Sequence, residues 1–158
     1  MTQITPFLWF DAEAEEAAQF YVSLFPNSKI TGVSRYPEGG PGAPGSVMVV
    51  SFELDGKPWT ALNGGPHFKF NEAISFVVHC KDQAEVDHYW DGLLAGGGQP
   101  SQCGWLKDRY GLSWQITPDA LVRMTTDPNP AKAQAAFSAM MTMGKIDIAG
   151  IQAAYDAA

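Results

Sequence analysis

The sequence is poor in the residues that disulfide frameworks, metal clusters and nucleic-acid interfaces need. Its 158 residues include only 2 Cys and 3 His. Cys80 and Cys103 form no closely spaced pair, so we expect two reduced thiols rather than a disulfide framework. Lys and Arg number 10 against 17 Asp and Glu, and the resulting net charge of −7 repels phosphate backbones. We therefore expect no nucleic-acid partner.

Long hydrophobic runs are also missing. No apolar segment reaches the roughly 20 residues that cross a bilayer. The first residues, MTQITPFLWFDAEAEE, lack the basic start and the apolar length of a signal peptide. We expect a cytoplasmic protein without a membrane partner. Hydrophobic residues nevertheless make up 46% of the chain and charged residues 17%, which is typical of a folded globular protein.

Periodic patterns in the first half of the chain predict a strand, a helix and three further strands. Asp11 is the expected N-cap of the helix, and Pro26 ends it. Gly and Pro fill the loop 37–45, and Asp55-Gly56 predicts a tight hairpin turn. Apolar or alternating runs indicate strands over 4–10, 29–36, 46–54 and 58–63.

The second half of the chain begins again in the same order, with a predicted strand over 73–80 and then a helix. Two amphipathic helices can look alike by chance, but here the strand and the helix share one offset. This internal repeat predicts an α+β fold of two βαβββ modules, over about 1–66 and 67–120. The pairs separated by 69 residues are Phe7 with Phe76, Glu16 with Glu85, Phe20 with Tyr89 and Tyr21 with Trp90.

The segment CGWLKDRYGLSWQITP closes the second module as two short strands joined by a polar turn. Asp108 and Arg109 look like turn residues with surface charge. We assign Trp114 to the core, whereas the pattern leaves the face of Trp105 open. The polar face of the last strand is either the wall of a ligand cavity or a solvated surface. On that strand Ser113, Gln115 and Thr117 alternate with Trp114 and Ile116.

Residues 121–158 follow a different pattern and are expected to form a C-terminal helical extension. Asn129 and Pro130 predict the start of a helix, and Gly144 predicts its end. A further helix follows. We interpret Met140, Met141 and Met143 as gap-filling contacts, with a Met-lined ligand surface as the alternative.

Three segments together resemble a known family: FDAEAEEAAQFYVSLFP, LNGGPHFKFNEAISFVVHCKDQAEVDHYW and CGWLKDRYGLSWQITP. They are similar to the PhnB-like proteins of the vicinal oxygen chelate (glyoxalase/bleomycin-resistance) superfamily. Members often carry the domain name 3-demethylubiquinone-9 3-methyltransferase. The resemblance implies one such domain over 1–120, with paired βαβββ modules cupped around a small-molecule cavity. It also implies that homodimers are common.

Metal-dependent members of this superfamily hold one ion with four side chains, usually His, Glu or Gln, from the first and last strands of each module. The resemblance places Ile4, Thr60, Ala73 and Gln115 at these positions. Ile4 and Ala73 have no donor atom, and Thr60 is a poor ligand. We therefore expect no metal ion and no other cofactor. A one-residue slip in register would exchange the two faces of a strand and change this set.

The histidines supply further candidates for ligand contacts. His67 lies in a Gly-rich loop that can present its side chain, or it is an ordinary loop residue. His79 shares a strand face with Ser75 and Val77, and it is either at a cavity rim or structural. His88 is expected to face solvent. The predicted ligand-binding residues are Gln115, Thr60, His67, Trp105, His79 and Ser113.

The main functional hypothesis is a small-molecule-binding protein of the glyoxalase fold, homodimeric and without a metal. The alternative is an enzyme: a lyase, an isomerase, or the methyltransferase of the family name. Gly96, Gly97 and Gly98 follow a predicted helix rather than a strand, so they do not form the glycine-rich loop of most S-adenosylmethionine enzymes. A third hypothesis is an interaction module that uses the C-terminal helices.

Overall fold

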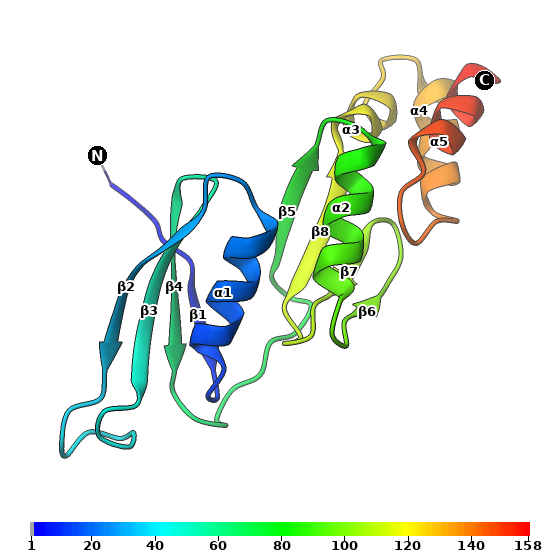
Figure 1. Ribbon diagram of the computed structural model, residues 1–158. Helices are drawn as coiled ribbons and strands as arrows, with labels where there is room; N and C mark the ends of the chain where they lie inside the picture. The colour runs from blue at the N-terminus through cyan, green and yellow to red at the C-terminus, as the bar shows by residue number, and fades with distance from the viewer. Residues whose placement is uncertain (1) are drawn as a thin grey trace. The chain divides into compact units, whose positions relative to one another are not determined.

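The computed structural model describes residues 2–158, which form two compact units (Figure 1). Unit 1 is Met1–Lys69 and unit 2 is Phe70–Ala158. Each unit contains one four-stranded sheet with a helix packed across one of its faces. Across the described residues, no helix is both long and apolar enough to cross a membrane.

Unit 1 has the order strand, helix, strand, strand, strand. Its elements are β1 (Phe7–Phe10), α1 (Ala14–Leu24), β2 (Lys29–Arg35), β3 (Val47–Leu54) and β4 (Lys57–Asn63). The strands are arranged β1-β4-β3-β2, with β1 parallel to β4 and the other neighbours antiparallel. The helix packs against β2, β3 and β4, and the core between them is apolar. Its members include Leu8, Phe10, Tyr21, Val50, Phe52 and Ala61.

The turn between β3 and β4 confirms the predicted hairpin. Asp55 has φ 50° and Gly56 has φ 74°. Two successive residues with positive φ are the signature of the tight turn that matches the twist of paired strands, and Asp-Gly suits both positions. The turn fixes the register of β3 on β4, and Ser51 consequently lies opposite Thr60.

Unit 2 repeats the same topology. Its first five elements are β5 (Ser75–Cys80), α2 (Gln83–Leu94), β6 (Gln99–Pro100), β7 (Trp105–Lys107) and β8 (Ser113–Pro118). The strand order β5-β8-β7-β6 matches that of unit 1, and β5 is parallel to β8. The helix packs against β5, β7 and β8. The predicted α+β fold of two βαβββ modules is confirmed.

The predicted offset holds in the helices but is wrong for the strands. Tyr21 and Trp90 are both buried, as their match requires. Phe7, however, is 59% exposed, whereas the ring of Phe76 lies 5.8 Å from the buried ring of Trp114. The connection from strand to helix is one residue longer in unit 1, where Glu13 rather than Asp11 occupies the N-cap position. Because of that extra residue, equivalent strand positions in the two units are 70 rather than 69 residues apart, so residues paired at an offset of 69 lie on opposite faces of their sheets.

Three helices follow the second module within unit 2: α3 (Asp119–Thr125), α4 (Pro130–Met140) and α5 (Ile148–Asp156). Asn129 caps α4 as predicted, since its Oδ1 accepts from the N–H of Ala131 at 3.0 Å. The helix ends at Met140, before Gly144. Met140 and Met143 pack on the small core of these helices, whereas Met141 is 49% exposed. That core consists of Leu121, Met124, Ala136, Ile146 and Ile151.

Gln83 at the start of α2 ties the C-terminal helices to the second module. Its Nε2 donates to the carbonyl of Ile146 at 3.0 Å, and its Oε1 accepts from the N–H of Ile148 at 2.9 Å. Lys145 forms an ion pair with Asp87 at 3.1 Å. The helical extension is thus attached by side-chain hydrogen bonds as well as by apolar packing.

Candidate functional site

The strand β8 presents one apolar and one polar face, as the sequence predicts. Trp114 and Ile116 are buried, 2% and 0% exposed, whereas Gln115 and Thr117 between them are half-buried. Because side chains alternate along a strand, Gln115 lies on the face of the sheet opposite Trp114. We call this the polar face of unit 2. Its members by strand register are Ser75, Val77, His79, Trp105, Lys107, Ser113, Gln115 and Thr117.

Gln115 stands at the middle of the polar face. It lies opposite Val77 on β5 and opposite Trp105 on β7. Its amide Nε2 donates to the hydroxyl of Ser75 at 2.8 Å. Trp105, whose face the sequence leaves open, therefore shares the polar face with Gln115. A flat indole beside an amide is an arrangement that can contact a planar polar molecule.

Ser113 carries a hydroxyl whose hydrogen bonding is incomplete. The residue is 1% exposed, and its Oγ has no hydrogen-bond partner among the described residues. In register it lies between Ser75 on β5 and Lys107 on β7. A buried polar group without a partner costs about 1–3 kcal/mol. A bound molecule or water that bonds to this hydroxyl would recover that free energy.

Lys107 places a positive charge at the edge of the polar face. Its ammonium forms an ion pair with Glu72, and both side chains are partly exposed. The hydrogen bond from Lys107 lowers the pKa of the Glu72 carboxyl. The pair is exposed, so an anionic group of a ligand can compete with Glu72 for the ammonium at little cost.

Asp108 is the residue of this region that the sequence interpretation missed. It was expected to carry surface charge, but it is 3% exposed. One carboxylate oxygen accepts from the N–H groups of Tyr110 and Leu112 at 2.9 and 3.1 Å, and the other accepts from the Trp114 indole N–H at 2.9 Å. The turn signal D-x-x-G predicts the backbone bonds. The bond to Trp114 depends on the folded hairpin, which it locks next to Gln115.

Unit 1 holds the other two predicted residues, at separate places. Thr60 is half-buried on β4, opposite Phe7 on β1 and Ser51 on β3. His67 lies beyond β4, where its ring contacts the edge of the Trp9 ring at 6.4 Å between centroids. In unit 2, His79 is exposed near the end of β5, opposite Thr117, and His88 is exposed on α2. The polar face therefore gathers Gln115, Ser113, Trp105 and His79.

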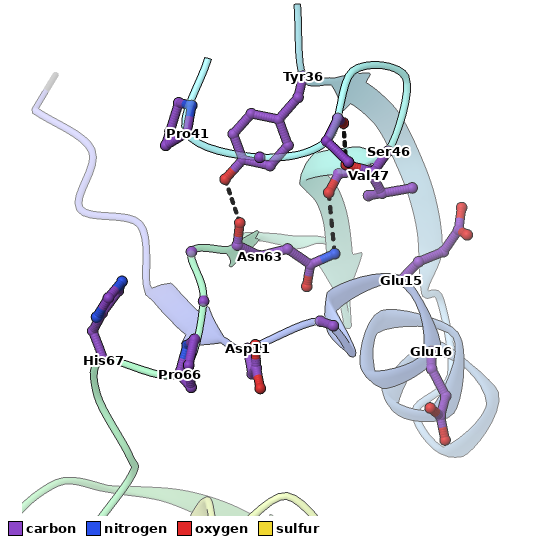
Figure 2. A pocket seen from close by; sticks show the side chains of 15 residues that line it. Asp11, Glu15, Glu16, Tyr36, Pro41, Ser46, Val47, Asn63, Pro66 and His67 are labelled. Atoms are coloured by element: carbon purple, nitrogen blue, oxygen red, sulfur yellow. Dashed lines mark hydrogen bonds between the residues drawn. The ribbon is translucent and has the colours of Figure 1, made fainter. Parts of the chain in front are cut away.

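A cavity of about 640 Å³ lies in unit 1 beside His67 (Figure 2). It is bordered by the start of α1, the loop between β2 and β3, and the segment that follows β4. The lining includes Asp11, Tyr36, Asn63 and His67. Of these, only His67 is among the predicted site residues. The others are far apart in sequence and share no motif, so only the folded chain brings them together.

Comparisons with known proteins identify the family of this chain. A family model described as 3-demethylubiquinone-9 3-methyltransferase matches residues 2–117. The chain belongs to this PhnB-like family. No curated protein matches it. A solved PhnB protein from Bacillus cereus is 37% identical, with a TM-score of 0.67, over 74% of this chain and 99% of that one.

Two more distant structures support the fold of this PhnB-like chain. The protein PA1353 from Pseudomonas aeruginosa is 17% identical, with a TM-score of 0.62, over 75% of this chain and 98% of that one. The fosfomycin resistance protein FosX from Listeria monocytogenes is 12% identical, with a TM-score of 0.51, over 75% and 93%. The predicted PhnB-like family is confirmed, and these two structures share its fold.

The residues of this PhnB-like protein do not fit the metal site that its resemblance to the vicinal oxygen chelate superfamily implies. Ile4 is 90% exposed and precedes β1, and Ala73 precedes β5. Thr60 lies opposite Phe7, and the amide nitrogen of Gln115 is bonded to Ser75. Within residues 2–158, no three His, Cys, Asp or Glu side chains are grouped so that they could hold a metal ion.

The methyltransferase in the family's description raises the same question for S-adenosylmethionine. Gly96 and Gly97 have positive φ in the turn that joins α2 to β6, and the guanidinium of Arg109 lies against Gly96. The Nε of Arg109 also donates to the carbonyl of Ala95 at 3.2 Å. These glycines end a helix, whereas the nucleotide-binding loop begins one after a strand. They do not fit that cofactor.

Proposed function

We propose that this PhnB-like protein binds a small organic molecule on the polar face of unit 2, at a site without a metal ion. The observation that carries the proposal is the buried hydroxyl of Ser113, which has no partner among the described residues. Buried polar groups in folded proteins are almost always bonded, so an exception marks a place for a ligand or an ordered water.

The neighbours of Ser113 supply the rest of the contacts. An amide carries two donors and one carbonyl acceptor, and Ser75 uses one donor of Gln115. Trp105, directly opposite Gln115, offers a flat apolar surface for a ring. Lys107, opposite Ser113, adds a cation. This set favours a planar molecule that carries a hydroxyl, carbonyl or carboxylate group.

Screening by protein NMR tests the proposed site. Small aromatic acids, amides and phenols are added to labelled protein, and binding is expected to shift the signals of Ser75, Trp105, Ser113 and Gln115. Gln115→Ala is expected to weaken such binding about 10-fold, which corresponds to one good hydrogen bond to a polar ligand. Ser34→Ala, on the exposed strand β2 of unit 1, is the control. Shifts that avoid the polar face would overturn the assignment.

The metal-free part of the proposal has its own measurement. Purified protein is dialysed and its zinc, nickel and iron contents are determined by elemental analysis. We expect far less than one equivalent of each. One retained equivalent that Gln115→Ala removes would refute the claim. Native mass spectrometry of the same sample reports any small molecule that co-purifies.

We also propose that the protein is a homodimer, as its family resemblance implies, and that it is cytoplasmic. Exposed apolar side chains on strands support an association, because Phe7 is 59% and Val77 43% exposed. Light scattering after size exclusion measures the mass in solution. A dimer is expected at micromolar concentration. A monomer at all concentrations would rule the homodimer out.

A further inference from the structure

The cavity of unit 1 is lined by residues between 11 and 67, none of which belongs to the polar face of unit 2. It lies where the parallel strands β1 and β4 end and where α1 begins. Carboxyl ends of parallel strands next to a helix start are a common place for ligands, because several loops converge there. The volume of about 640 Å³ is that of a site for a small molecule. We call it the α1 cavity.

Asn63 holds the walls of the α1 cavity together. Its Oδ1 accepts from the N–H of Ala14 at 2.8 Å, and its Nδ2 donates to the carbonyl of Val47 at 3.1 Å. The hydroxyl of Tyr36 donates to the carbonyl of Asn63 (Figure 2). One residue thus joins α1, β3 and the end of β2. The cavity is pre-formed, and a ligand need not order these segments.

The loop between β2 and β3 closes tightly over Tyr36. The N–H of Tyr36 donates to the carbonyl of Ser46, and the N–H of Gly45 donates to the carbonyl of Tyr36, both at 2.9 Å. A Cβ on Gly42 would overlap the ring of Tyr36. The ring is 9% exposed and lines the cavity. It is therefore an aromatic wall whose position is fixed by the backbone on both sides.

The α1 cavity is negatively charged. Among the described residues, those that line it include the carboxylates of Asp11, Glu15 and Glu16 and no Lys or Arg. The start of α1 contributes only about half a positive charge through the helix dipole, which the carboxylates of Asp11 and Glu15 outweigh. In Figure 2, the two glutamates project from the first turn of α1, whereas Asp11 lies between that turn and Pro66. A cation is the ligand that this field favours.

The spacing of the carboxylates decides between a metal ion and a larger cation. Among the described residues no trio of His, Cys, Asp and Glu is close enough to hold a metal. Separated carboxylates around an aromatic wall suit an extended organic cation, whose ammonium groups can contact Asp11 or Glu15 and the face of Tyr36. We propose that the α1 cavity binds a small organic amine, with a diamine as the best match.

Titration with three molecules of similar length tests the charge requirement. Putrescine carries two cations, 1,4-butanediol is neutral, and succinate carries two anions. We expect putrescine to bind with a millimolar or lower Kd and to shift the NMR signals of Asp11, Tyr36 and His67. Neither of the other molecules should do so. Equal shifts with butanediol, or none with putrescine at tens of millimolar, would overturn the proposal.

Neutral variants locate the site. Asp11→Asn and Glu15→Gln, both of which keep the shape of the side chain, should each weaken putrescine binding about 3- to 10-fold. Asp156→Asn on α5 makes the same charge change in unit 2 and should leave Kd unchanged. If all three variants weaken binding equally, putrescine is attracted only by the net charge of −7. In that case the α1 cavity is not its binding site. Loss of putrescine binding leaves the polar-face proposal unaffected, because its ligands are scored by signals of unit 2.

Discussion

The bond between Asp108 and Trp114 allows a quantitative test of what positions the polar face. Asp108→Asn keeps the shape of the side chain and one oxygen for the N–H groups of Tyr110 and Leu112. Its new amide group would then face the indole N–H of Trp114, now 2.9 Å from a carboxylate oxygen. The Asn amide N–H and the indole N–H, both donors, would then face each other where a charge-assisted hydrogen bond now exists. Neither donor would reach water, because Trp114 is 2% exposed.

The expected cost follows from these contacts. Loss of one hydrogen bond to a charged group removes about 1.5–3 kcal/mol, and the unsatisfied indole N–H adds part of its desolvation cost. We expect Asp108→Asn to lower the free energy of unfolding by about 2–4 kcal/mol. For a chain of this size that lowers Tm by roughly 5–15 °C. Asp55→Asn, an exposed turn residue with φ 50°, is the matched control and should change stability by less than about 0.5 kcal/mol.

A double-mutant cycle separates this bond from other effects. Urea unfolding followed by circular dichroism is measured for Asp108→Asn, for Trp114→Phe and for both together. Because Trp114→Phe removes the indole donor, Asp108→Asn should cost about 1–2 kcal/mol less in its presence. Additive effects within about 0.3 kcal/mol would refute the claim that this bond locks the hairpin. The NMR signals of Gln115 should also move in Asp108→Asn if the bond positions the polar face.

Three further predictions test the packing. Gly64→Ala places a Cβ against the Trp9 ring, whose Nε1 donates to the Gly65 carbonyl at 2.9 Å. We expect this variant to lower the free energy of unfolding, measured in urea, by about 1–3 kcal/mol. The control Gly32→Ala, whose Cβ meets open space on β2, should lower it far less. Burial raises the pKa of the Cys80 thiol to about 12. At pH 8 a thiol reagent should therefore label only the half-buried Cys103 in the folded protein, and both thiols in urea. Rapid labelling of two thiols in the folded protein would contradict this prediction. Gln83→Ala removes the hydrogen bonds to residues 146 and 148 and should speed amide hydrogen exchange in α5. The control Gln134→Ala, which loses one exposed hydrogen bond to Ser138, should not change that exchange. Equal exchange rates in both variants would show that apolar packing alone holds the helical extension.

Local patterns were sufficient for several features that depend on near neighbours. The alternation on β8 correctly placed Trp114 in the core and Gln115 on the other face. The dipeptide Asp55-Gly56 predicted its turn, and Asn129 predicted the cap of α4. The repeat of strand and helix patterns predicted two βαβββ modules. Apart from the repeat, each of these signals lies within a few residues and reflects backbone sterics or side-chain periodicity.

Other features needed the tertiary structure, because they depend on partners far away in the chain. The match of Phe7 with Phe76 failed, since one extra residue before α1 exchanges the strand faces without altering the local pattern. Asp108 looked like a surface charge because its bond to Trp114 exists only once β7 and β8 pair. His67 was a candidate by sequence, but its cavity is formed with Asp11, Tyr36 and Asn63.

The sequence by itself determined most elements of this protein, the repeat and the family, because periodicity, turn chemistry and motif content can be read along the chain; the short strand β6 and the helix α3 were not predicted. Only the tertiary structure decided which candidates share a surface. It grouped Gln115, Ser113 and Trp105 on one polar face of unit 2, placed Thr60 on a strand of unit 1, and formed a charged cavity that no motif marks. Strand register and loop convergence are set by long-range pairing and packing, and a sequence pattern with a period of 2 or 3.6 residues does not contain that information.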